Sequence, residues 1–269
     1  MLENKRAETL RLLRESGENV SGQDLCEHFG ISRTAVWKIM NQLKEEGYEI
    51  EAVQNKGYCL KDVPDVLGES EIKSRLHETA YLNPDLKIVF EDKRGAEPEQ
   101  IIYHEPDGIL GFIRELNHKK EVVHDPVYFK GEAEGIEVEV AFQYVNEFHE
   151  NVLGFCNNIY NAEGGTHLTG FKTTFTTAIN QYARELGILK EKDETGADIR
   201  NGMTAIVSIK HPDPRFEGQT KTKLDNPDAA KACSKVTNDE IIRFFDRNLE
   251  TLKKVIGCAE KAAKIRKTE

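Results

Sequence analysis

The sequence lacks the long apolar run that a membrane-spanning helix needs. No apolar stretch approaches about 20 residues, and charged side chains already occur within residues 1–6. Cysteine is sparse: the five thiols are far apart and never form Cys-x-x-Cys, which argues against a disulfide framework and a zinc site. The eight histidines show no ligand-like pairing. We therefore expect a soluble, cytoplasmic protein with idle thiols and no bound metal.

Acidic side chains outnumber basic ones, 47 to 37, and give a formal net charge of −10 across 269 residues. Proteins that coat nucleic acid without sequence preference need many cationic contacts, so this charge disfavours that class but allows a local DNA-reading surface. The length is sufficient for a small domain and one of ordinary size. Basic residues gather near the C-terminus, as is typical of a helix end: Lys253, Lys254, Lys261, Lys264, Arg266 and Lys267.

Three amphipathic helices are predicted at the start of the chain. Apolar residues recur at helical spacing over residues 4–15. Ser21 begins an approximate capping box, which predicts a second helix over residues 22–29. A third helix is predicted over residues 33–46, with Ser32 as its cap. Because the turn between the second and third helices is so short, the pair forms a helix-turn-helix.

The third helix should present a donor-rich outer face. Its apolar stripe of Val36, Met40 and Leu43 is expected to point inward. The residues beside or outside that stripe are suited to DNA phosphates and base edges. The predicted DNA-binding set on this helix is Ser32, Arg33, Thr34, Trp37, Lys38 and Asn41.

A β-hairpin follows the third helix. Residues 48–53 alternate with period two, residues 54–57 turn, and residues 58–60 return. This hairpin predicts a wing with Lys56 at its tip, and Lys56 joins the predicted DNA-binding set. Some winged helices are protein-interaction modules instead, and the slightly acidic balance of this domain keeps that alternative open.

Three segments of this first domain carry a family resemblance: residues 22–25 (Gly-Gln-Asp-Leu), 31–38 (Ile-Ser-Arg-Thr-Ala-Val-Trp-Lys) and 55–58 (Asn-Lys-Gly-Tyr). Residues 1–70 resemble the N-terminal winged helix of the bacterial biotin repressor family. The resemblance implies an operator-reading role for Arg33, Thr34, Trp37 and Lys38. The Gly-Arg-Gly-Arg-type loop of that family's biotin-ligase domain does not occur in this sequence, so the resemblance does not extend to biotin binding or ligation.

A second domain is predicted beyond a Pro- and Gly-punctuated stretch around residues 62–70. Helices are predicted from residue 71 onward, at 109–117 and at 165–187, and strands at 86–90, 101–103, 127–129, 136–142, 152–159 and 204–209. The expected fold class is α+β, with a winged helix-turn-helix followed by a sheet covered by helices. The expected divisions are residues 1–63 for the first domain, 64–72 for a linker, 73–225 for the second domain and 226–269 for C-terminal helices.

Three further segments carry a second resemblance: residues 157–171 (Asn-Asn-Ile-Tyr-Asn-Ala-Glu-Gly-Gly-Thr-His-Leu-Thr-Gly-Phe), 198–205 (Asp-Ile-Arg-Asn-Gly-Met-Thr-Ala) and 216–224 (Phe-Glu-Gly-Gln-Thr-Lys-Thr-Lys-Leu). Residues 73–269 resemble the transducer domain of DNA gyrase B, which is part of a type IIA DNA topoisomerase. The resemblance implies a ribosomal S5 domain 2-like fold that passes the state of bound ATP to DNA-handling parts.

In that family a Gln-Thr-Lys loop reaches the γ-phosphate of ATP held in the preceding ATPase domain, which implies phosphate sensing by Gln219, Thr220 and Lys221. An ammonium and an amide donor suit a terminal phosphate, although the residues alone indicate only a surface lysine on a loop. The ATPase motifs and the Glu-Gly-Asp-Ser-type cleavage motif are not found in this sequence. We therefore expect no catalytic residues and no cofactor for this chain alone, and ATP and Mg²⁺ only if a partner supplies an ATPase domain.

Several local features have structural interpretations. Gly164-Gly165 before a helix could cradle an anion, but close helix–strand packing is favoured. Asp198 and Arg200 are expected to form a salt-bridge or capping pair. Asn226 followed by Pro227 should cap a helix, and two further helices are predicted over residues 239–248 and 251–266.

Three functional hypotheses follow. The leading one is a non-catalytic DNA-binding protein that acts on transcription or DNA topology. The alternative is a partial subunit of an ATP-hydrolysing type II DNA topoisomerase that works with partner chains, and a third is a fusion of gene fragments without a selected function. The candidate partners are double-stranded DNA, a second copy of the chain in a homodimer, and gyrase subunits; no membrane is expected.

Overall fold

The computed structural model describes residues 2–16, 19–53, 56–62, 69–93, 98–188 and 196–266. The chain divides into two compact units, one of Met1–Ala80 with Lys87–Tyr103 and one of Tyr81–Leu86 with His104–Glu269. Helices and sheets occur in both units, which confirms the α+β class. The expected interdomain stretch at 63–68 and the wing turn at 54–55 lie outside the described residues. Within the described ranges, no helix is long and apolar enough to cross a membrane.

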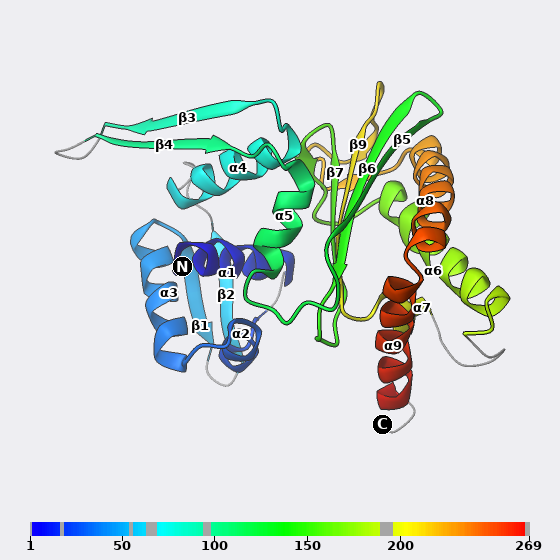
Figure 1. The fold of residues 1–269 in the computed structure, drawn as a ribbon. Helices are drawn as coiled ribbons and strands as arrows, with labels where there is room; N and C mark the ends of the chain where they lie inside the picture. The colour runs from blue at the N-terminus through cyan, green and yellow to red at the C-terminus, as the bar shows by residue number, and fades with distance from the viewer. Residues whose placement is uncertain are drawn as a thin grey trace. The chain divides into compact units, whose positions relative to one another are not determined.

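The first unit contains a winged helix-turn-helix followed by a helix and a hairpin (Figure 1). Its elements are α1 (Leu2–Ser16), α2 (Gly22–Phe29), α3 (Arg33–Glu45), β1 (Glu49–Val53), β2 (Gly57–Asp62), α4 (Glu69–Leu82), β3 (Lys87–Asp92) and β4 (Glu99–His104), of which α4 and β4 end within the second unit. Strands β1 and β2 pair antiparallel, and β3 pairs with β4.

The helix boundaries of the winged helix follow from local chemistry. The Ser21 hydroxyl accepts a hydrogen bond from the Gln23 amide at the start of α2, and Ser32 accepts one from Ala35 at the start of α3. Gly30 ends α2 in the left-handed conformation, with φ of 59°. The predicted inward stripe of α3 is confirmed, because its apolar residues join one buried cluster: Leu10, Leu13, Leu25, Val36, Ile39, Met40, Leu43, Tyr48 and Ile50.

Helix α4 joins the winged helix through Glu71. One carboxylate oxygen accepts from the Arg14 guanidinium at 3.1 Å, and the other accepts from the Tyr48 hydroxyl at 3.3 Å. On the same helix, Lys73 pairs with Glu99 of β4 at 2.8 Å. These contacts make the winged helix, α4 and the β3–β4 hairpin one compact unit.

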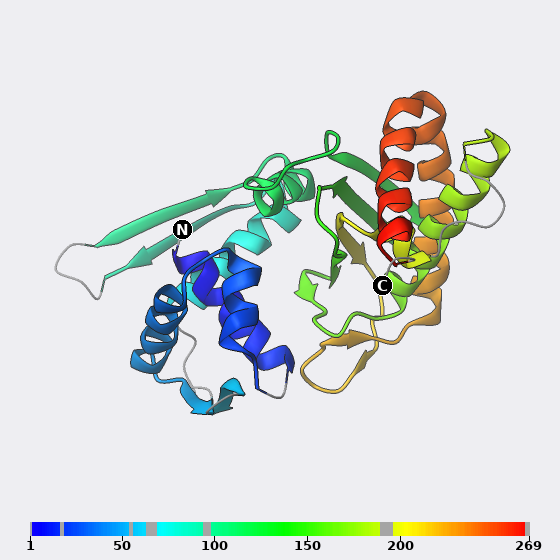
Figure 2. The ribbon, with the colours of Figure 1, turned by 90° about the horizontal axis from the view of Figure 1, so that it is seen from below.

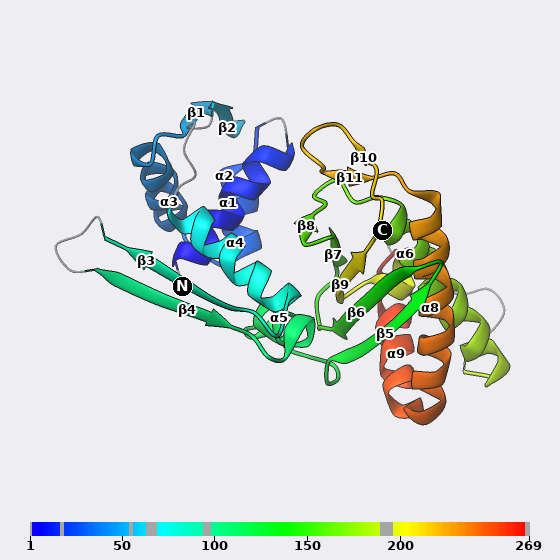
Figure 3. The same ribbon diagram turned by 90° about the horizontal axis from the view of Figure 1, so that it is seen from above.

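The second unit is a five-stranded sheet with helices on both faces (Figures 1 and 3). Its elements are α5 (Gly108–Asn117), β5 (Val127–Ala133), β6 (Ile136–Tyr144), β7 (Asn151–Cys156), β8 (Ile159–Tyr160), α6 (Thr166–Glu185), α7 (Gly196–Arg200), β9 (Met203–Lys210), β10 (Phe216–Glu217), β11 (Lys223–Leu224), α8 (Pro227–Arg247) and α9 (Leu249–Arg266). The strand order is β5-β6-β9-β7-β8, and β7 runs parallel to β9 while the other neighbours are antiparallel.

Strand β9 is buried on both of its faces. Val207 and Ile209 join the cluster under α6 and α8, whereas Ile206 joins the cluster under α5. This two-sided burial explains the near-continuous apolar run of β9, since a strand covered on both faces has no polar side.

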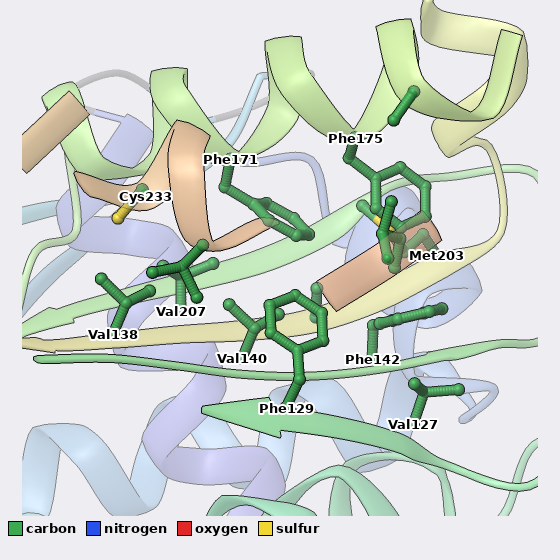
Figure 4. Packing of buried hydrophobic residues seen from close by; sticks show 14 of the residues in the cluster. Val127, Phe129, Val138, Val140, Phe142, Phe171, Phe175, Met203, Val207 and Cys233 are labelled. Carbon is green, nitrogen blue, oxygen red and sulfur yellow. The ribbon is translucent and has the colours of Figure 1, made fainter. Parts of the chain in front are cut away.

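Helix α6 covers the sheet with aromatic side chains (Figure 4). Phe171 and Phe175 are fully buried and point down onto the strands. The Phe175 ring meets the Phe142 ring of β6 edge-on, with centroids 5.3 Å apart. Such aromatic pairs add to the stabilisation from area burial.

The structure corrects the predicted C-terminal helices. The helix that begins at Pro227 continues without a break to Arg247, so the predicted separate helix over residues 239–248 is the second half of α8. Its apolar residues at helical spacing, among them Val236 and Ile241, pack on the same core and keep the helix continuous. Asn226 stands at the N-cap position, but its side chain bonds the backbone of residues 213 and 215 and makes no cap bond.

The predicted pairing of Asp198 with Arg200 is also wrong. The buried carboxylate of Asp198 accepts two hydrogen bonds from Arg266, at 3.1 and 2.8 Å. Arg200 donates to Glu150 at 2.9 Å and to Thr176 at 2.7 Å. Both residues therefore have structural partners, each from a segment distant in sequence.

Replacement of Phe175 by alanine is expected to destabilise the second unit by about 3–5 kcal/mol, because it leaves a cavity beneath α6. Urea unfolding followed by circular dichroism would measure this change. Thr177→Ala, at an exposed position of the same helix, should change the free energy of unfolding by less than about 0.5 kcal/mol. Equal effects of the two substitutions would contradict the packing described here.

Burial of His167 should make the stability of the second unit sensitive to acid. Its side chain is fully buried and burial lowers its pKa from 6.5 to about 4. The folded-state pKa lies below the unfolded one, so the unfolded chain gains a proton first and stability falls as the pH drops from 6.5 toward 4. The loss amounts to about 3 kcal/mol. A His167→Leu variant should lose this part of the pH dependence of unfolding, and an unchanged slope between pH 6.5 and 4.5 would contradict the assignment.

Candidate functional site

The outer face of α3 carries most of the predicted DNA-binding residues. Arg33, Thr34 and Lys38 are exposed, and Trp37 exposes 56% of its surface although it is a large aromatic residue. Asn41 is half-buried on the same helix. The residues lie outside the buried stripe of α3, as a helix that enters a DNA groove requires.

Arg33 is aligned by a neighbour that sequence reasoning did not single out. Its guanidinium donates to the Gln23 side-chain oxygen at 3.0 Å, and the Gln23 amide donates to Glu27 at 2.7 Å. These two hydrogen bonds orient the guanidinium, and its other N–H groups can still donate to an acceptor such as a phosphate oxygen. The signal in the sequence was the position of Gln23 in the first turn of α2, because helix N-termini are frequent phosphate contacts.

Ser32 caps α3, and this uses its side-chain oxygen as an acceptor. Its oxygen accepts the hydrogen bond from Ala35 that caps α3, at 3.3 Å. Its hydroxyl proton is not used in that bond, so Ser32 can still donate to a phosphate oxygen.

The wing is held close to the start of α2. Tyr58 and Val20 exchange two backbone hydrogen bonds of 2.8 Å each. Gly57 has φ of 106°, and a side chain there would meet the Val20 carbonyl at 2.0 Å, so only glycine fits this crossing. Lys56 is exposed beside it. A cleft of about 510 Å³ is lined by Arg33 and Lys56 among other residues, which brings these two cations to one surface.

The Gln219–Lys221 segment lies at the tip of the β10–β11 hairpin, which extends from the end of β9 (amber in Figure 2, labelled in Figure 3). Gln219, Thr220 and Lys221 are all exposed. The Lys221 ammonium lies 5.8 Å from the centroid of the Phe216 ring on the same hairpin, a cation–π contact. The tip thus exposes an amide, a hydroxyl and an ammonium, all of which can donate hydrogen bonds.

Two asparagines, Asn157 and Asn226, fix the base of this hairpin; Asn226 was predicted only as a helix cap. Asn157 donates to the His211 carbonyl and accepts from the His211 amide, both at 2.8 Å. Asn226 accepts from the Arg215 amide at 2.5 Å and donates to the Asp213 carbonyl at 3.2 Å. The segment leading to the tip is therefore bonded at its start by one side chain and near its end by another.

Gly165 confirms the close-packing interpretation of the paired glycines. Its φ is 145°, and a side chain there would meet the Leu224 carbonyl oxygen at 2.5 Å. Strand β11 thus runs directly against the start of α6.

Other chemistry is not indicated in the described ranges. No group of three or more His, Cys, Asp or Glu side chains there could hold a metal ion. Cys156 and Cys233 are buried, and burial raises the pKa of both thiols, to about 12 for Cys156, which disfavours a nucleophilic thiolate.

Comparison with known proteins identifies both parts of the chain. A sequence profile for DNA gyrase B matches residues 108–269, and one for an HTH domain matches residues 5–59. The DNA gyrase B protein of Enterococcus faecalis is 40% identical over 228 residues, which is 81% of this chain and 36% of the relative. The DNA gyrase B protein of Bacillus mycoides is 43% identical over 198 residues, 72% of this chain and 49% of the relative.

Solved structures of gyrase B proteins also match this chain. The 43K ATPase domain of Thermus thermophilus gyrase B, in complex with an aminocoumarin, matches with a TM-score of 0.66 and 34% identity, covering 81% of this chain and 61% of that one. The gyrase B protein from Myxococcus xanthus matches with a TM-score of 0.58 and 26% identity, covering 73% and 65%.

The chain spans about a third of the length of the Enterococcus relative. The gyrase B profile covers more than half of this chain, and the fold of the second unit confirms the sheet-and-helix architecture that the motifs at residues 157–171, 198–205 and 216–224 predicted. With a helix-turn-helix domain in front of that region, the chain belongs to the DNA gyrase B family.

Proposed function

We propose that this chain is a DNA-binding protein, non-catalytic by itself, in which a winged helix reads duplex DNA and a gyrase B-like transducer acts on transcription or DNA topology. The observation that carries the proposal is the exposed row of Arg33, Trp37 and Lys38 on α3. Guanidinium and ammonium groups on such a face suit phosphates and guanine edges. The exposed Lys56 supports a wing contact on the same duplex.

The first domain is proposed to be biotin repressor-like in how it reads an operator, through Ser32, Arg33, Thr34, Trp37, Lys38, Asn41 and Lys56. The proposal includes no biotin chemistry. The domain limits that accompany it are 1–63 for the winged helix, 64–72 for the linker, 73–225 for the transducer and 226–269 for its C-terminal helices.

The second candidate function is that of a partial subunit of an ATP-hydrolysing type II DNA topoisomerase. It is favoured by membership of the gyrase B family and by the exposed hairpin tip with Gln219, Thr220 and Lys221. ATP and Mg²⁺ would be bound mainly by a partner's ATPase domain, and this chain would supply the sensing contacts to the terminal phosphate.

The proposed partners are double-stranded DNA, gyrase subunits and a second copy of this chain. DNA and the gyrase subunits use separate surfaces. DNA would contact the first unit, whereas gyrase subunits would contact the second unit, whose relatives are gyrase B proteins.

An Arg33→Ala, Lys38→Ala double variant should bind duplex DNA at least tenfold more weakly, because it loses two charge-assisted contacts worth about 1–3 kcal/mol each. Fluorescence anisotropy on DNA fragments enriched by the intact chain, at several salt concentrations, measures this change. The dependence of affinity on salt should become shallower by about two phosphate contacts.

A Lys231→Ala, Lys235→Ala variant serves as the matched control, because it removes the same charge from exposed positions of α8. It should bind as the unaltered chain does. Equal losses in both variants would show a general charge effect, and no loss in either would exclude α3 as the DNA reader.

Lys221 tests the second candidate function. Mixed with the ATP-binding part of a gyrase B protein, the chain should stimulate ATP hydrolysis, and Lys221→Ala should reduce the stimulated rate by about tenfold to a hundredfold, since one fewer donor meets the transferred phosphoryl group. Lys223→Ala, two residues further on and paired with Glu217, should leave the rate nearly unchanged. Stimulation that is indifferent to Lys221 would count against phosphate sensing.

A further inference from the structure

Two segments distant in sequence lie together beside the exposed hairpin tip. One connects β8 to α6 over residues 161–165, and the other runs through the β10–β11 hairpin over residues 216–224. Figure 3 shows β10 and β11 near β8 at the same end of the second unit. Hydrogen bonds join the two segments at successive points along the chain.

The first point is Asn161. Its side-chain amide donates to the Lys221 carbonyl at 2.9 Å, and only 2% of its surface is exposed. Its own backbone amide donates to the Gly154 carbonyl of β7 at 2.8 Å. Asn161 therefore connects the backbone of Lys221 directly to the central sheet.

This bond falls on a residue with a costly backbone conformation. Lys221 has φ of 56°, in the left-handed region that a non-glycine residue adopts only at a cost of about 1–2 kcal/mol. Such a conformation persists when the surroundings fix it, and the Asn161 contact does so. The direction in which the Lys221 side chain leaves the loop depends on the same φ.

The second point is Glu163, which forms two hydrogen bonds with Thr222. The Glu163 amide donates to the Thr222 carbonyl at 3.0 Å, and its carboxylate accepts from the Thr222 hydroxyl at 2.8 Å. The Thr222 hydroxyl in turn lies 3.4 Å from that of Thr220. The tip is thus bonded immediately after Lys221 as well as at it.

The remaining points lead into α6. The Leu224 amide donates to the Gly164 carbonyl at 3.1 Å, and Gly165 forms a bridge with Leu224. Since Thr166 begins α6, the tip, the 161–165 segment and the main covering helix form one continuous bonded path.

We propose that Asn161 and Glu163 are positioning residues that hold the Gln219–Lys221 tip in its sensing conformation and tie it to the start of α6. The inference rests on the proposed phosphate-sensing role of that tip. The tip is then preformed without nucleotide, and a pull on Lys221 by a bound phosphate acts on α6 through Asn161, Glu163 and Gly164. A preformed loop binds with a smaller loss of conformational entropy than a loop that must first become ordered.

Hydrogen–deuterium exchange on the full chain tests, without any partner, whether Asn161 and Glu163 hold the tip. Glu163→Ala should raise amide exchange across residues 218–224 by about fivefold, the factor that corresponds to one net hydrogen bond. Asn161→Ala should have a similar effect centred on residue 221. Glu163→Gln retains an acceptor for the Thr222 hydroxyl and should restore the slow exchange.

Glu260→Ala, which removes an equal charge from an exposed position of α9, is the control and should leave residues 218–224 unchanged. Exchange in the core strand β9 should stay slow in every variant, which separates a loosened tip from an unfolded domain. Unchanged exchange at 218–224 in both Glu163→Ala and Asn161→Ala would overturn the proposal.

ATP hydrolysis by the chain mixed with the ATP-binding part of a gyrase B protein separates the positioning role of Glu163 from the phosphate-sensing role of Lys221. Glu163→Ala should lower kcat of the Lys221-dependent stimulation severalfold, with a smaller change in KM, and Glu163→Gln should recover it. Full stimulation in Glu163→Ala despite a loosened tip would overturn the positioning role alone. Absence of Lys221-dependent stimulation in the unaltered chain would overturn the phosphate-sensing role, and the positioning role with it. The exchange measurement would still show whether Asn161 and Glu163 hold the tip.

Discussion

Burial of α6 on the five-stranded sheet is the contact on which the rest of the second unit depends. Phe171 and Phe175 are removed from water by the central strands, and β9 is covered on its other face by α5. Because interiors are close-packed, the helix has one depth and one rotation on this sheet. Its first residue follows Gly165, whose lack of a side chain lets β11 run against it. The position of an exposed and polar hairpin tip is therefore fixed by an apolar core.

In the first unit, too, a buried apolar cluster holds a helix whose outer face carries polar side chains. Val36, Met40 and Leu43 fix α3 in the core, which leaves one face of the helix outside. Gly57 lets the wing cross Val20 closely and places Lys56 and Arg33 along one cleft. Each unit thus carries exposed cationic side chains on a buried apolar framework, Arg33 and Lys56 in the first and Lys221 in the second. The gyrase B profile matches the region of Lys221, at residues 108–269, and the HTH profile matches the region of Arg33 and Lys56, at residues 5–59.

Short-range chemistry explains what was predictable from the sequence. Helix α2 has the predicted bounds, since Ser21 and Gly30 act on their immediate neighbours, and the outward side of α3 followed from its own periodicity. Long-range partners account for the errors. Asn226 carries the features of a cap but bonds residues 213 and 215, and Asp198 pairs with Arg266 rather than with Arg200. Gln23, Asn161 and Glu163 were missed because their roles arise only when distant segments meet.

If DNA contacts the first unit and gyrase subunits contact the second, as proposed, the chain should bind both partners at once. The most direct measurement is sedimentation of a fluorescent duplex, chosen for selective binding to the intact chain, with the chain alone and then with purified gyrase subunits added. We expect a shift with the chain and a further, chain-dependent shift with the subunits, because the two partners use different units. Competition between duplex and subunits, or the absence of any further shift, would contradict it.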